Sequence, residues 1–259
     1  MRLSDQLGKP HGRVRQRPPA YLIPLALLLA LAVAVGYRST RPPGHGDLPA
    51  FDQPEVAAMK AAFFDFLRPI AQYHNQRIAE ERRWLLRVAG KESPGWLEQH
   101  RLERLAKRYG IDPAEVARDE MLAVLKRRVD IVPESLVLIQ AAKESGWGRS
   151  RMAREGNTLF GERCFDDGCG VVPEARREGA SHEVRSFPTV NAAVGSHVHN
   201  LNTHPGYAEF RKARQKLRQD DKALSGIALA EYLVRYSERG DAYVKEIISM
   251  IVQNDLEAG

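Results

Sequence analysis

The sequence has little excess of either charge over most of its length. The formal net charge is +6, and residues 1–41, with seven basic side chains and one acidic side chain, account for all of it. The remainder balances to zero, so the part expected to fold lacks the basic surface that polyanion binding requires. We therefore expect no nucleic-acid partner. Internal repeats and low-complexity tracts are also missing, which argues against a repeat architecture.

Cysteine is scarce as well, since Cys164 and Cys169 are the only two. Two thiols without companion ligands make a poor zinc site. Four histidines lie in the same half of the chain: His182, His197, His199 and His204. His197 and His199 stand two apart on an expected helix and so point away from each other. We expect no metal site and no cofactor.

Charged side chains are missing from residues 20–37, an 18-residue run at the short end of what spans a bilayer. Five basic residues precede the run and two follow it, which favours a cytoplasmic N-terminus and export of everything downstream. We expect a basic cytoplasmic leader over 1–19, an inner-membrane anchor over 20–37 and a periplasmic domain. A cleaved signal peptide is the alternative. Export makes a disulfide between the two cysteines the default.

The rest of the chain is mostly helical in its pattern. A stretch rich in proline and glycine over 38–50 predicts a tether. Residues 51–125 predict amphipathic helices that form either a stalk or a helical half of the catalytic domain, which we place at 126–259. There, Val171-Val172 and residues 182–187 could pair as a hairpin. The predicted fold class is α+β, mostly α, with a helical body and a small β-hairpin lobe in a lysozyme-like layout.

Glu144 is the main catalytic candidate. It shares one face of a predicted helix with Val137 and Ala141, and Gly146 suits the helix end. In the last turn the helix dipole disfavours negative charge, and partial burial beside Trp147 would also raise the carboxyl pKa. Such a carboxyl suits a general acid that protonates a glycosidic oxygen. The alternative is a solvated surface glutamate beside an ordinary core tryptophan.

Glycoside hydrolysis commonly needs a second carboxylate. Glu183 is the first candidate, because alternate side chains of its expected strand would face the cleft. Glu174 and Glu178 are the rivals, and assistance by the substrate itself also stays open. Four aromatic residues could stack on sugar rings, with core packing as the alternative: Trp147, Phe160, Tyr207 and Tyr243.

Five motifs follow one another between residues 125 and 255: Glu144-Ser145-Gly146-Trp147-Gly148, Asn157-Thr158-Leu159-Phe160-Gly161, Phe187 ahead of a helix, His204-Pro205-Gly206-Tyr207, and Tyr236 with Asp241-Ala242-Tyr243. In this order they resemble the bacterial exo- and endo-β-N-acetylglucosaminidases, which include the flagellar peptidoglycan hydrolase and autolysins. The Cys164…Cys169 clip and the stretch 200–205 resemble the Bax-type branch in particular, whose members are bacterial and unrelated to the apoptotic protein.

The resemblance implies a lysozyme-like fold and cleavage of the β-1,4 bond that follows N-acetylglucosamine in peptidoglycan. It places Glu144 at the family's catalytic acid and Tyr236 or Tyr243 near a functional tyrosine that orients the substrate. The chain lacks the acidic-aromatic strand motif of the flagellar and autolysin members, which leaves the second carboxylate and the stereochemical course open. A non-catalytic wall-binding scaffold and a lytic transglycosylase are the alternative functions.

Overall fold

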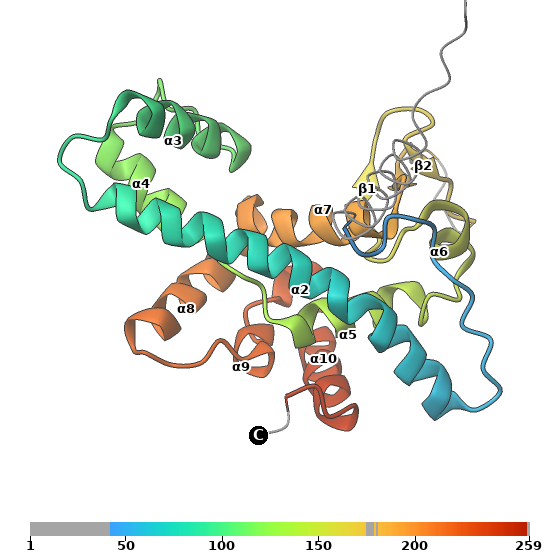
Figure 1. Cartoon of the computed structure of the whole chain (residues 1–259). Helices are drawn as coiled ribbons and strands as arrows, with labels where there is room; N and C mark the ends of the chain where they lie inside the picture. Colours follow the sequence, from blue (N-terminus) through green and yellow to red (C-terminus); the bar gives the residue numbers. More distant parts are fainter. Residues whose placement is uncertain (1–41, 175–178, 180, 258–259) are drawn as a thin grey trace, which may run out of the picture. The chain divides into compact units, whose positions relative to one another are not determined.

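Helices form most of the molecule, and one small sheet interrupts them (Figure 1). The computed structural model describes residues 42–257 except 175–178 and 180. Its helices are α2 (Val56–Ala89), α3 (Trp96–Arg108), α4 (Arg118–Arg128), α5 (Glu134–Ser145), α6 (Arg151–Gly156), α7 (Val190–Thr203), α8 (Ala208–Gln219), α9 (Gly226–Ala230) and α10 (Asp241–Gln253). Two 3-10 turns, η1 (Pro205–Tyr207) and η2 (Val234–Tyr236), lie between them. This is the mostly helical α+β chain that the sequence predicted, and it fits a lysozyme-like domain.

The expected leader over 1–19 and anchor over 20–37 lie outside the described residues. Within the described part of the chain, none of the helices combines the length and the apolar character that a bilayer crossing requires.

The sheet has three short antiparallel strands: β1 (Arg163–Cys164), β2 (Gly170–Val171) and β3 (Glu183–Arg185). The strand β3 lies in the middle, with Val171 opposite Val184 and Cys164 opposite Glu183. The predicted hairpin therefore forms, and β1 adds a strand too short to leave a periodic pattern in the sequence. The expected Cys164–Cys169 disulfide is present, with a Cα–Cα distance of 6.2 Å. We call this sheet with its disulfide loop the β-lobe.

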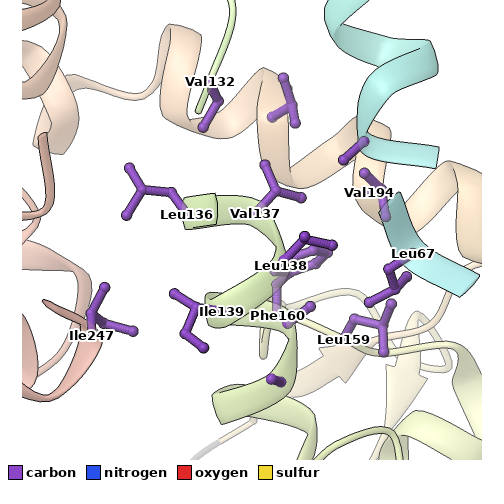
Figure 2. Close-up of a cluster of buried hydrophobic side chains, with 14 of the residues drawn as sticks. Leu67, Val132, Leu136, Val137, Leu138, Ile139, Leu159, Phe160, Val194 and Ile247 are labelled. Carbon is purple, nitrogen blue, oxygen red and sulfur yellow. The ribbon is translucent and has the colours of Figure 1, made fainter. Parts of the chain in front are cut away.

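Helix α5 runs through the centre of the main core. All residues from Ser135 to Ala142 are buried, because helices cover it on every side. Figure 2 shows Leu136, Val137 and Ile139 of α5 among Leu67 of α2, Val194 of α7 and Ile247 of α10. This packing makes α5 a rigid support and leaves its last turn, which carries Glu144, at the edge of the core.

Helix α2 contributes to two hydrophobic cores. Its first half, with Phe63 and Leu67, packs in the core around α5, whereas Leu85 near its end joins α3 and α4 in a second core. Residues from Pro42 onward form one compact unit. The predicted boundary between residues 125 and 126 stays a prediction.

Residues 42–51, which we call the N-terminal strap, lie against the body, although the sequence predicted a tether over 38–50. The carbonyl oxygens of Gly44 and Gly46 accept hydrogen bonds from the first amides of α7, over 2.8 and 3.2 Å. The Leu48 amide donates to Oδ1 of Asn157 over 2.8 Å, and Phe51 is buried against Phe63. Proline and glycine in this segment exclude regular secondary structure, but the segment still finds hydrogen-bond partners.

Replacing Asn157 by glycine is expected to destabilise the protein by about 1–3 kcal/mol, because buried polar groups lose their partners. The Asn157 amide also donates to Asp47 and to the Phe187 carbonyl, over 3.1 and 3.0 Å. Its φ of 53° is left-handed, so glycine, unlike alanine, removes the bonds without backbone strain. Urea unfolding measures the loss, and hydrogen exchange at the Leu48 amide should accelerate. Unchanged exchange there would show that Asn157 does not hold the strap.

Candidate active site

A cleft of about 1330 Å³ lies between the β-lobe and the helical body. It is lined by the end of α5, the segment from α6 into β1, the end of α7 with η1, and the turn after η2. Charged side chains of both signs line it: Glu144, Glu162, Arg163, Arg235, Glu238 and Arg239. A second hollow of about 410 Å³ shares Glu144, Gly161 and Pro173 with the first. Glu144 therefore stands where the two hollows meet.

Glu144 occupies the last turn of α5, as the sequence predicted. The helix stops at Gly146, whose φ of 59° is left-handed, and the Gly148 amide donates to the Ser145 hydroxyl over 2.7 Å. The Glu144 side chain is exposed along the open cleft, although a half-buried position was expected. The protein around the carboxyl nevertheless desolvates it, and this desolvation raises the pKa of Glu144. A hydrogen bond from Tyr243 lowers the pKa, but desolvation is the larger effect.

Three tyrosines gather beside Glu144. The rings of Tyr236 and Tyr243 stack with centroids 5.2 Å apart, and Tyr207 lies 6.1 Å from Tyr236. The Tyr236 hydroxyl donates to the Phe160 carbonyl over 3.1 Å. Burial raises the pKa of Tyr207 to about 12 and that of the other two further, with the nearby carboxylates adding to the shift. The tyrosines therefore keep their protons and act as hydrogen-bond donors.

Glu162 is a carboxylate of the cleft that the sequence analysis missed. It follows Gly161 on the β-lobe side, and burial raises its pKa. Its Oε2 accepts a hydrogen bond of 2.8 Å from the Ser196 hydroxyl, while its buried Oε1 has no partner among the described residues. The charges of Glu162 and Glu144 both raise the pKa of Tyr207, so the two carboxylates stand around the same tyrosine. The one available signal was its position directly after the Asn157–Gly161 motif.

Comparison with known proteins identifies the family to which the chain belongs. Residues 120–256 match the family model Glucosaminidase, described as mannosyl-glycoprotein endo-beta-N-acetylglucosaminidase. The chain belongs to this glucosaminidase family. It is also 36% identical over 203 residues to Protein bax of Escherichia coli (strain K12), which covers 78% of this chain and 72% of that protein. No solved structure matches. The resemblance to the Bax-type branch is confirmed, and the glucosaminidase match identifies the chain as an enzyme of glycosidase type.

Glu183 does not face the cleft of the glucosaminidase domain. Its two carboxylate oxygens accept hydrogen bonds from the Gly168 and Gly170 amides, over 3.2 and 2.7 Å, within the disulfide loop. The preceding residue, His182, lines the cleft. Of the rivals, Glu174 pairs with Arg151 over 3.0 Å and Glu178 lies outside the described residues. Glu162 therefore lines the cleft, whereas Glu183 does not.

Two of the four predicted sugar-stacking residues pack in the core of the glucosaminidase domain. The Trp147 ring meets Phe63 and Phe64 edge to face, with centroids 5.7 and 5.3 Å away, and does not line the cleft. The Tyr243 ring is buried beneath Tyr236. Phe160 and Tyr207 do line the cleft. One face of Phe160 is covered by His197, whose ring centroid lies 3.8 Å away, so Tyr207 is the better platform for a sugar.

Proposed function

We propose that this glucosaminidase hydrolyses the glycan strands of peptidoglycan at the β-1,4 bond that follows N-acetylglucosamine. The proposal depends on one observation above all, the Glu144 carboxyl of raised pKa at the meeting point of two hollows. A chain-like substrate can pass Glu144 on both sides there. The motifs shared with cell-wall autolysins support peptidoglycan as the substrate. The predicted export and inner-membrane anchor would place the domain in the periplasm beside it.

In this mechanism Glu144 donates its proton to the glycosidic oxygen as the bond to the anomeric carbon breaks. Positive charge develops on the sugar ring, and a carboxylate on the opposite side stabilises it or activates water. We assign that role to Glu162, which directly precedes β1, lines the cleft and, like Glu144, raises the pKa of Tyr207.

Replacing Glu162 by glutamine is expected to lower kcat by about 10²-fold, in the range of a lost catalytic base. The Glu155→Gln variant is the matched control, because Glu155 is an exposed glutamate of α6 that pairs with Arg151 over 2.8 Å and lines neither hollow. Steady-state release of soluble glycan from sacculi measures both variants. Addition of azide should partly restore the rate of Glu162→Gln if the carboxylate attacks or stabilises the sugar. Full activity of Glu162→Gln would leave assistance by the substrate as the mechanism.

Digestion of purified sacculi tests the function itself. After reduction with borodeuteride, mass spectrometry should find fragments that end in deuterium-labelled N-acetylglucosaminitol. Fragments that end in anhydro-muramic acid would instead identify a lytic transglycosylase. Binding to sacculi without release of glycan fragments would support the alternative of a non-catalytic wall-binding scaffold. A high-mannose glycopeptide belongs in the same assay, because the family description names that substrate, and its cleavage without cleavage of sacculi would contradict the proposal.

A further inference from the structure

A chain of buried polar groups leads from the core to Glu144. Gln140 stands one helical turn before Glu144 on α5 and is fully buried. Its Nε2 lies 3.1 Å from the Tyr243 hydroxyl, and its Oε1 lies 3.2 Å from Nε2 of His197. On the other side of Tyr243, hydrogen bonding from its hydroxyl lowers the pKa of the Glu144 carboxyl. Three elements, α7, α5 and α10, thus meet in one line of hydrogen bonds.

The donors and acceptors in this series of hydrogen bonds can be assigned in only one direction, from His197 toward Glu144. His197 is fully buried, and burial lowers its pKa to about 3, so the ring is neutral and has one N–H. Its Nδ1 has no partner within the described part of the chain, so the proton belongs on Nε2, where Gln140 Oε1 accepts it. The Gln140 amide must then turn its NH₂ group toward Tyr243. The Tyr243 oxygen accepts that bond, and its single proton is left for Glu144.

We propose that Gln140 and His197 are positioning residues that direct the Tyr243 proton onto one oxygen of Glu144. The catalytic proton then resides on the other carboxyl oxygen of Glu144. This inference rests on the proposed function of Glu144 as the general acid. Gln140 and His197 contact neither the substrate nor the reacting atoms, and they act through Tyr243.

We call the series of hydrogen bonds from His197 through Gln140 and Tyr243 the relay. Its loss would change the pKa of Glu144 in a defined direction. A donor to the carboxylate favours the ionised form, so losing the Tyr243 bond raises the pKa of Glu144. Lys143 and Arg239 also lower this pKa and Glu246 raises it, but Glu246 pairs with both, each over 2.6 Å. The other charged or titratable groups that line the cleft are Glu162, Arg163, His182, His204, Tyr207, Arg235, Tyr236 and Glu238. All of these groups are kept in the variants below, so a shift between profiles reports the relay.

The Gln140→Met variant keeps the approximate shape and removes the amide. We expect the alkaline limb of its kcat/KM profile to move up by about half a pH unit, since a hydrogen-bond chain weakens when one member is lost. Tyr243→Phe should move the limb further in the same direction. Adding Gln140→Met to Tyr243→Phe should produce no further shift, because the effect passes through the tyrosine. Equal shifts in both backgrounds would overturn the relay.

The His197 pair provides a second comparison that does not depend on Gln140→Met folding. His197→Gln can still present an N–H to Gln140 and should keep the wild-type profile. His197→Leu cannot donate a hydrogen bond to Gln140, so the alkaline limb of its kcat/KM profile should move to higher pH. Asn75→Leu is the control for lost stability, because Asn75 makes two hydrogen bonds to the Val132 backbone, over 2.7 and 3.1 Å, away from the relay. Its profile should not move.

A direct titration separates failure of this inference from failure of the proposed function. The ¹³C carboxyl resonance of Glu144, assigned by its absence in Glu144→Gln, reports the pKa without any substrate. Should wild-type protein release nothing from sacculi, the titration still compares Gln140→Met with wild type. If the wild type is active and Gln140→Met titrates like it, Gln140 does not position the acid.

Discussion

Replacing Glu144 by glutamine is expected to lower release of glycan fragments from sacculi by about 10³-fold. Glutamine has the same shape and still accepts the Tyr243 proton, but it has no proton for the leaving oxygen. General-acid catalysis contributes about 10²–10⁴-fold, so the loss corresponds to about 4 kcal/mol of transition-state stabilisation. Binding to sacculi should persist, because the remainder of the cleft is unchanged.

The measurement pairs fragment release with sedimentation of the protein on sacculi. Glu209→Gln is the control, since Glu209 is an exposed glutamate of α8 that pairs with Lys212. The wild-type profile should lose activity as pH rises through the raised pKa of Glu144, because the acid must hold its proton. Near-normal release by Glu144→Gln would refute the assignment of the acid, and loss of binding would indicate a wider structural defect.

Replacing Arg214 by leucine is expected to lower the free energy of unfolding by about 3–5 kcal/mol, the range for breaking a buried charge network. Arg214 of α8 is fully buried. It donates to the carbonyls of Arg127, Asp130 and Ile131 where α4 ends, over 2.9, 3.2 and 2.8 Å. Burial lowers the pKa of Arg214 to about 10, so the guanidinium stays charged. Leucine would leave three carbonyls without this donor.

The Asp130 carboxylate would also lose a cation, although Arg218 and Arg82 stay beside it, 3.0 and 3.6 Å away. Urea denaturation followed by circular dichroism measures the difference. Lys212→Met on the exposed side of α8 should change stability by less than about 0.5 kcal/mol. An Arg214→Leu variant as stable as wild type would mean that packing alone holds α8 against α4.

The sequence predicted those parts of the fold that local pattern determines. The apolar run of α5 and the glycine after it located Glu144 in the last turn. Two isolated cysteines in an expected export context predicted their disulfide. The paired strands β2 and β3 followed from β-branched residues around a glycine turn. These features depend on neighbours within a few dozen residues, which is why pattern alone reveals them.

The missed features depend on contacts between distant residues. The surroundings of Glu162 in the cleft are made by Ser196 and Tyr207, which lie on other elements. Trp147 follows Glu144 closely, yet the left-handed turn at Gly146 and Trp147 carries the Trp147 ring toward α2. No periodicity encodes these placements, because packing between elements decides them.

The N-terminal strap determines where a mechanical load would enter the domain. A pull on the chain ahead of Pro42 would first stretch the bonds of Gly44 and Gly46 to α7 and that of Leu48 to Asn157. Only after these ruptured would tension reach α2, which supports α5 from one side. The hydrogen bonds of the strap would therefore break before a pulling force could change the shape of the cleft.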